Sequence, residues 1–191
     1  MPLSGPLTGF IYRDKGKGYV TSASLQQFGK GAAASSGGGN LAVLTGPVGN
    51  GADTTEDILF QGVLPANSLD INGRQVLIEA YGNISATSAV KTLKIYFGSS
   101  IVWTAINITP AAATTGDWQA QLLVTKTGAN AQRAVATLDF SAAASVRSVT
   151  RFTGTENDSA AAGILCKITG QSSVATANTV LADCFAIGGY N

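Results

Sequence analysis

The sequence predicts an all-β fold: an antiparallel two-sheet β-sandwich, jelly-roll-like, with an extended N-terminal arm. Along most of the chain apolar and polar side chains alternate, which is the period of two expected of a strand with one buried face. Turn residues such as Asn72-Gly73 separate these runs, and this pair accepts the positive φ angles of a tight hairpin turn. No stretch of a dozen residues has the 3.6-residue period of a helix.

The first 50 residues differ in composition from the remainder. They hold three of the five prolines, and residues 31–40 read GAAASSGGGN, which is the composition of a flexible spacer. We therefore predict an arm and hinge over residues 1–50 and the β-sandwich domain over residues 51–191. The arm combines aromatic with basic residues, which a merely solvating tail would not need. The candidate docking residues of the arm are Phe10, Tyr12, Arg13, Lys15, Lys17, Tyr19 and Phe28.

Roughly eight strands are predicted after the arm, which is the number in a jelly roll. An immunoglobulin-like sandwich is the main alternative, although it usually needs only about 100 residues. The predicted strands cover residues 58–63, 75–81, 92–97, 118–125, 133–140, 146–152, 164–168 and 180–187.

Several side chains that should face outward from these strands are apolar. Exposed apolar patches on a soluble protein mark contact sites, and a closed ring of identical subunits is a common way to cover them. We therefore expect a homotrimer or another ring. The candidate subunit-interface residues are Leu77, Tyr81, Tyr96, Leu123 and Val135, and Val149 is a further outward apolar residue.

The inventory of side chains argues against catalysis. The chain has no histidine, which removes Ser-His-Asp and Cys-His catalysis and every histidine-containing zinc or iron site. Acidic clusters at residues 53–57 and 156–158 lack the spacing of an EF-hand calcium loop, and no glycine-rich stretch has the spacing of a phosphate-binding loop. We expect no enzyme activity, no cofactor and no metal site. Whether Cys166 and Cys184 pair is left open, because it depends on whether their strands are neighbours.

Charge and hydropathy limit the partners. The net charge is +1, which gives no electrostatic basis for binding nucleic acid. No apolar run is long enough to span a membrane, and the N-terminus lacks the pattern of a signal peptide. We therefore expect neither nucleic-acid nor membrane contact, and assembly in the cytoplasm. Charged residues make up 12% of the chain, against about 25% in a typical domain, which suits a protein whose surface is largely buried in an assembly.

The positive charge is concentrated in the arm. Residues 1–50 hold four basic residues and one acidic residue, which gives 4 − 1 = +3. The remainder holds eight basic and ten acidic residues, which gives 8 − 10 = −2. A charge of this size neutralises few phosphates of a packaged genome. It favours a modest electrostatic contact with an acidic protein surface.

Residues 55–102 resemble a module of bacteriophage structural proteins of the head-fibre, capsid-decoration or tail type. The resemblance depends on LPANSL at residues 64–69, the turn at 72–73 and LKIYFG at 93–98, and it continues to about Phe140. It covers about half of the chain and excludes the arm. It implies a jelly-roll-like, often trimeric module on the virion surface, and it is structural rather than catalytic.

These observations together predict a bacteriophage virion protein that decorates the capsid, either a cement or a head-fibre protein. Its expected partners are copies of itself and the major capsid protein or another virion protein. One alternative is a tail fibre or receptor-binding protein that contacts the host surface. Another is a small jelly-roll coat protein or a lectin-like module that binds a host-surface glycan. A carbohydrate-active enzyme on the same fold is a further alternative, and for it and the lectin the candidate sugar-stacking residues are Tyr81, Trp103 and Trp118.

Overall fold

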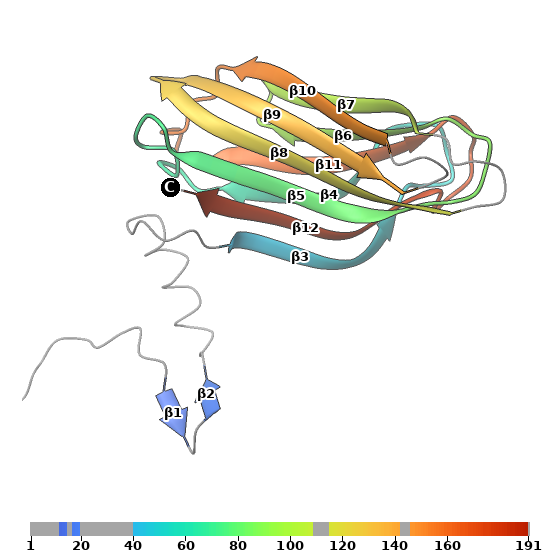
Figure 1. Ribbon diagram of the computed structural model, residues 1–191, viewed down its shortest axis with the longest axis horizontal. Coiled ribbons are helices and arrows are strands. Elements are labelled where there is room, and N and C mark those ends of the chain that lie inside the picture. Colours follow the sequence, from blue (N-terminus) through green and yellow to red (C-terminus); the bar gives the residue numbers. More distant parts are fainter. Residues whose placement is uncertain (1–11, 15–16, 20–39, 109–114, 142–145, 191) are drawn as a thin grey trace, which may run out of the picture.

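The computed structural model describes residues 12–14, 17–19, 40–108, 115–141 and 146–190. For residues 12–14, 17–19, 40, 101–102, 105–108, 146–149 and 190 it describes the backbone alone. The described residues contain strands and no helix. Two antiparallel sheets pack face to face as a β-sandwich (Figure 1), which confirms the predicted fold class.

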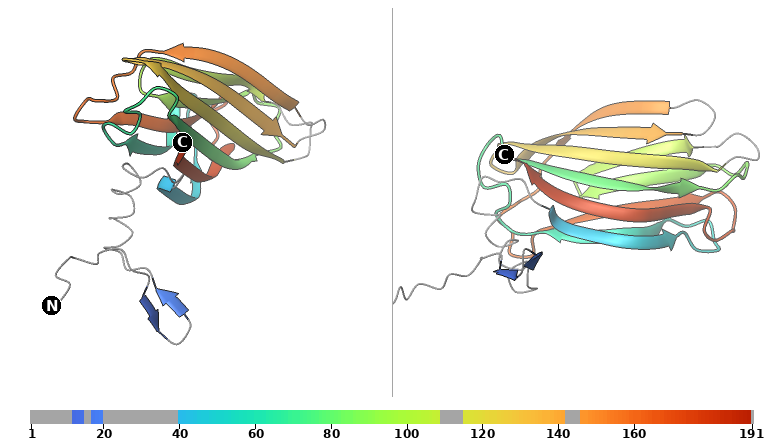
Figure 2. Two further views of the ribbon diagram at one scale, coloured as in Figure 1. Left: turned by 60° about the vertical axis from the view of Figure 1, so that its left-hand side comes forward. Right: turned by 60° about the horizontal axis from the view of Figure 1, so that its bottom comes forward.

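The larger sheet has six strands in the order β10-β9-β8-β5-β12-β3. The C-terminal strand therefore lies inside the sheet, between β5 and β3 (Figure 2). The strands of this sheet are β3 (Asn40–Gly49), β5 (Gln75–Ile84), β8 (Gly116–Gly128), β9 (Ala131–Phe140), β10 (Val146–Gly154) and β12 (Val180–Tyr190).

The smaller sheet has four strands in the order β4-β11-β6-β7. Its strands are β4 (Asp57–Leu64), β6 (Lys91–Phe97), β7 (Ile101–Ile108) and β11 (Ile164–Ser172). Two short strands near the N-terminus, β1 (Tyr12–Asp14) and β2 (Lys17–Tyr19), pair with each other as a separate antiparallel hairpin.

The connectivity is that of a jelly roll with one added hairpin. When β9 and β10 are set aside, the remaining eight strands form sheets ordered β8-β5-β12-β3 and β4-β11-β6-β7. The chain crosses repeatedly from one sheet to the other, as the two Greek keys of a jelly roll require. Hairpin β9–β10 extends the larger sheet beyond β8, and this extension widens its outer surface.

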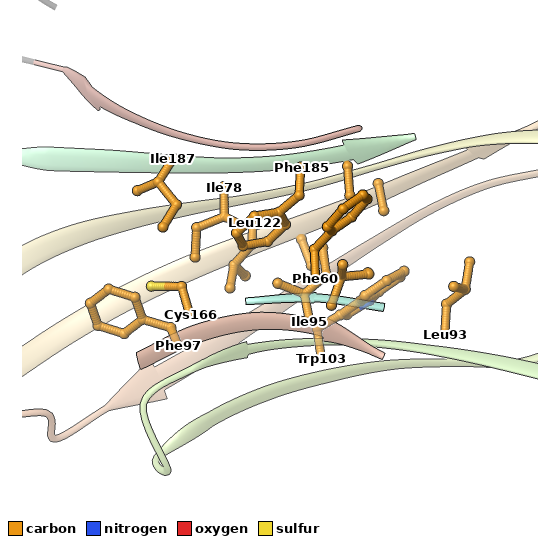
Figure 3. Close-up of a cluster of buried hydrophobic side chains, with 14 of the residues drawn as sticks. Phe60, Ile78, Leu93, Ile95, Phe97, Trp103, Leu122, Cys166, Phe185 and Ile187 are labelled. Atoms are coloured by element: carbon orange, nitrogen blue, oxygen red, sulfur yellow. The ribbon is translucent and has the colours of Figure 1, made fainter. Parts of the chain in front are cut away.

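Alternation along the strands builds the core between the sheets. On β8, Trp118, Ala120, Leu122 and Val124 are buried while the residues between them are not. Figure 3 shows how side chains from the two sheets meet, and the rings of Phe60 and Phe185 stack with centroids 6.5 Å apart. Fully burying one large apolar side chain stabilises the folded state by about 1.5–3 kcal/mol, so this layer is the main support of the fold.

Two parts of the sandwich were not predicted. Strand β3 begins at Asn40, so the sandwich starts 51 − 40 = 11 residues before the predicted start at residue 51, and residues 40–49 form a strand in place of the predicted hinge. The hinge was predicted from the spacer at residues 31–40 and from the prolines of the first 50 residues, Pro47 among them, but β3 is an edge strand and edge strands tolerate proline. Strand β7 was also missed, because its sequence IVWTAINI lacks a regular polar alternation.

The loops at one end are joined by a buried asparagine. Asn50 is 2% exposed, and its Oδ1 accepts hydrogen bonds from the backbone N–H groups of Thr179 and Val180, at 2.8 and 2.9 Å. Its Nδ2 donates to the carbonyl of Thr176. The link between β3 and β4 is thereby fixed to the start of β12, which holds the edge strand in register.

Candidate functional site

The two outer faces of the sandwich are the surfaces available to partners. We call the solvent side of the larger sheet the six-strand face and that of the smaller sheet the four-strand face. Four of the five candidate interface residues lie on the six-strand face, namely Leu77, Tyr81, Leu123 and Val135. The fifth, Tyr96, lies on the four-strand face, so the structure does not bring the five into one patch.

Three aliphatic residues form a row across the six-strand face. Leu77 on β5 is the register partner of Leu123 on β8, and Leu123 is the partner of Val135 on β9. Val135 is 36% exposed and the two leucines are half-buried. Directly opposed side chains in neighbouring strands are in contact range. These three residues, which we call the aliphatic row, therefore form one continuous apolar strip in a single subunit.

Tyr81 is the most exposed aromatic side chain among those described, at 51%. It lies on β5 between its register partners Gln119 of β8 and Cys184 of β12. A side-chain hydrogen bond with Cys184 raises the pKa of Tyr81 above its ordinary value, and the nearby charge of Asp183 acts in the same direction. At neutral pH the phenol is therefore uncharged, and its ring is available for stacking.

A β-bulge beside Tyr81 re-aims one acidic side chain. In the ladder between β12 and β5, Ala182 pairs with Gly82 and Cys184 pairs with Tyr81, so no residue of β5 lies opposite Asp183 in the register. Glycine is required at position 82, because a Cβ atom there would lie 2.0 Å from the carbonyl oxygen of Leu181. Bulges of this kind commonly redirect a side chain at functional surfaces.

The bulge borders an open hollow on the six-strand face. The hollow has a volume of about 530 Å³, which is within the range of small-ligand sites. It draws on four neighbouring strands, and no lysine or arginine lines it among the described residues. Its lining residues are Tyr81, Gly82, Asp117, Trp118, Gln119, Asp139, Phe140, Ser141 and Asp183.

The hollow is acidic. Asp117 is exposed and Asp183 is half-buried, and neither carboxylate takes part in an ion pair within the described part of the chain. Asp139, the third carboxylate, already has an interaction partner. Sequence reasoning missed these residues, although Asp183 could have been noticed because it interrupts the apolar run VLADCFAI.

Tyr96 is engaged within its own subunit. Its hydroxyl donates to Glu56, which also accepts hydrogen bonds from Lys94 and from Thr169. The ammonium of Lys167 lies 4.2 Å from the centre of the Tyr96 ring. Burial opposes ionisation of Glu56, but these donors outweigh it and hold the pKa of Glu56 below its ordinary value.

Both tryptophans are unavailable for sugar stacking. Trp103 is 1% exposed and Trp118 is 2% exposed. The indole N–H of Trp118 donates to the carbonyl of Leu181 at 3.1 Å, so this side chain supports the floor of the hollow instead. Of the three candidate stacking residues only Tyr81 presents its ring to solvent.

The acidic clusters of the sequence have internal roles. Asp53 accepts a hydrogen bond from the backbone N–H of Thr55, and Asp57 accepts one from Gly51. Glu156 accepts from the backbone of Ser99 and Ser100. Asp158 forms a buried ion pair with Lys126 at 3.1 Å. In the described part of the chain no group of three or more acidic or cysteine side chains is arranged to hold a metal.

The two cysteines are not bonded to each other. Cys166 lies on β11 and faces the core, where burial raises the pKa of its thiol to about 12. Cys184 lies on β12 and is half-buried beside Tyr81 on the six-strand face. Only Cys184 is therefore placed to react with a reagent in solution.

The candidate docking residues of the arm are not brought to any surface by the described structure. Tyr12, Arg13, Lys17 and Tyr19 lie in hairpin β1–β2, for which the backbone alone is described. Phe10, Lys15 and Phe28 lie outside the described residues. Their role as a docking segment stays a prediction.

The fold and its surfaces define the chain as an antiparallel β-sandwich of jelly-roll order. A scan against protein-family models found no match, and no curated protein matches the chain either. Within the described residues no helix has the length and hydropathy that crossing a membrane would require.

Proposed function

We propose that this protein is a structural protein of a bacteriophage virion that decorates the capsid as a cement or head-fibre protein. In this proposal the sandwich associates with copies of itself, as a homotrimer, through the six-strand face. The arm contacts the major capsid protein or another protein of the particle. The protein acts by packing and not by catalysis.

The observation that carries this proposal is the aliphatic row of Leu77, Leu123 and Val135, which is open to solvent in the single subunit. Burial of apolar area is the main driving force of subunit association, and a continuous strip buries more area than scattered residues. The low content of charged residues, 12%, supports the same conclusion, because such a surface resists self-association weakly.

The test is to add the purified full-length protein to phage shells assembled without it. We expect saturable binding with one oligomer at each symmetry-related position, measured by sedimentation and by the mass of the decorated particle. Binding without saturation, or no binding to any shell of the virus that encodes the chain, would contradict the proposal.

A second candidate function is recognition of a host-surface glycan by the virion, as in a tail fibre or a lectin-like module. Tyr81 favours it, since an exposed aromatic ring at the edge of a polar hollow can stack on a sugar ring while Gln119 and Ser141 offer hydrogen bonds. Binding to a glycan array by the full chain, lost in Tyr81→Ala and retained in Ile58→Ala on the four-strand face, would promote this function over decoration.

A further inference from the structure

The acidic hollow on the six-strand face lacks a described cationic partner. Asp117 and Asp183 line it without an ion pair, and Tyr81 exposes half of its side chain at its edge. Carboxylates beside an exposed aromatic face suit a guanidinium or an ammonium group, which can pair with the acids and lie over the ring. The chemistry of the hollow is therefore that of a site for basic side chains.

The chain itself carries a segment of matching charge. Residues 13–17 read RDKGK and hold three basic residues against one acid. The chain from residue 40 onward carries eight basic and ten acidic residues, a net charge of −2. Opposite charges on the segment and on the hollow favour their encounter and fix its orientation.

The length of the linker allows this contact within one subunit. Asn40 pairs with Gly188, and Gly188 pairs with Leu77, four residues before Tyr81 on β5. From strand spacing and rise, Tyr81 is therefore roughly 17 Å from Asn40. Lys17 and Asn40 are 40 − 17 = 23 residues apart, and a chain of that length can reach up to about 76 Å. The linker is therefore long enough for the segment to reach the hollow of its own subunit, which favours a contact within one copy.

We propose that the hollow is the docking site of this chain's own basic segment, residues 13–17, with its cationic side chains against Asp117 and Asp183. This inference goes beyond the proposed function, because it places the basic segment on the chain's own sandwich and leaves the aromatic residues of the arm for the contact with the particle. Docking brings the arm next to the aliphatic row, on the face through which copies are proposed to associate.

Cys184 gives a direct readout of the contact. It is half-buried beside Tyr81, whereas Cys166 is buried with an unreactive thiol, so a maleimide reports on one position of the native protein. We expect the double variant Lys15→Gln/Lys17→Gln to react at Cys184 several-fold faster than the parent chain at low salt. At high salt the two chains should react equally, because ionic screening releases the segment.

Matched controls separate this effect from unrelated changes. Lys30→Gln removes one positive charge of the arm outside the proposed segment and should leave the rate unchanged. Asp183 adjoins Cys184 and its substitution would alter the thiol directly, so the arm variants are used for this readout. Equal rates for the parent chain and the double variant at low salt would overturn the proposal.

Carbodiimide crosslinking identifies the partners. This reagent joins adjacent amines and carboxylates, so we expect links from Lys15 or Lys17 to Asp117 or Asp183. In a mixture of isotopically light and heavy chains the links should lie within one copy. They should disappear in Asp117→Asn/Asp183→Asn and persist in Glu79→Gln, which removes an acid of the same face outside the hollow.

Two outcomes of the crosslinking would contradict the proposal. Links that form only between copies would assign the hollow to a neighbouring subunit, and an absence of links would leave it to another ligand such as a glycan. Failure of the proposed function is a separate result, since a chain that stays monomeric and ignores phage shells can still form the link within one copy.

Discussion

On the four-strand face a half-buried carboxylate is surrounded by donors, whereas on the six-strand face two carboxylates at the hollow lack an ion pair among the described residues, although Glu79 on the same face accepts a hydrogen bond from Gln121. Glu56 accepts hydrogen bonds from Lys94, Tyr96 and Thr169 in the smaller sheet. Across the sandwich, Asp117 and Asp183 line a hollow without an ion pair among the described residues. A half-buried carboxylate costs free energy unless it is paired, so the hollow beside the half-buried Asp183 is expected to meet a partner.

The largest effect on the free energy of unfolding is expected from adding a side chain at Gly82, which lines the hollow. In Gly82→Ala the new Cβ would lie 2.0 Å from the Leu181 carbonyl oxygen, so the bulge at Asp183 must shift. We expect a loss of about 3 kcal/mol in the free energy of unfolding, measured by denaturant titration. Gly62→Ala is the control, because its nearest contact is the flexible end of Ile187 at 3.1 Å. Equal stability of the two variants would show that the bulge is not rigid.

A charge-neutralising substitution should distinguish the two faces. Glu56→Gln removes a charged acceptor of three side-chain donors, and we expect it to lower the free energy of unfolding by about 2 kcal/mol. Asp183→Asn, the same chemical change on the six-strand face, should stay within about 0.5 kcal/mol of the parent chain. Thermal and denaturant unfolding of both variants measure the contrast, and a larger loss for Asp183→Asn would reverse it.

Low pH should reduce the contribution of Glu56 to the free energy of unfolding. The folded-state pKa of Glu56 is lowered by its donors, so its contribution is fully present above the unfolded-state pKa of about 4.3. It is lost as the pH falls through the lower folded-state value. The stability difference between the parent chain and Glu56→Gln should therefore shrink below that pH. Glu156, whose pKa is also lowered, acts in the same window in both chains and cancels in the difference. A difference that is constant from pH 7 to pH 3 would contradict the assignment.

The smallest contrast concerns the two tyrosines. Tyr96→Phe removes a hydrogen bond to Glu56, and we expect a loss of about 1 kcal/mol. Tyr81→Phe leaves an exposed ring in place and removes only a hydrogen bond with the thiol of Cys184, which is a weak partner, so we expect no measurable change in the free energy of unfolding. If Tyr81→Phe were the more destabilising variant, the six-strand face would be less open than its geometry indicates.

Alternation predicted the sandwich but could not predict which outward residues share a face. A period of two says that Tyr81 and Tyr96 both point away from the core, and nothing in it tells which sheet each strand joins. The two tyrosines are separated because β5 pairs with β12 and β8, whereas β6 pairs with β11 and β7. These pairings are set by contacts between distant parts of the chain. The candidate interface was therefore split between two surfaces.

The site was harder to predict than the fold for a second reason. The hollow depends on a bulge at Asp183, on the absence of a side chain at Gly82 and on carboxylates from separate strands. A bulge shifts the register by one residue, and the sequence shows it only as an irregularity in an apolar run. Strand β3 was overlooked for a similar reason, since Gly46 and Pro47 are also typical of loops.

The most direct test of the central claim is the mass of the full-length protein in solution, measured by native mass spectrometry for the parent chain, Leu123→Asp and Val63→Asp. Leu123 lies in the middle of the aliphatic row, whereas Val63 is 51% exposed on the four-strand face. We predict a trimer for the parent chain and for Val63→Asp, and a folded monomer for Leu123→Asp. A parent chain that is monomeric at all concentrations, or a Leu123→Asp variant that still forms the trimer, would contradict the claim that copies associate through the six-strand face.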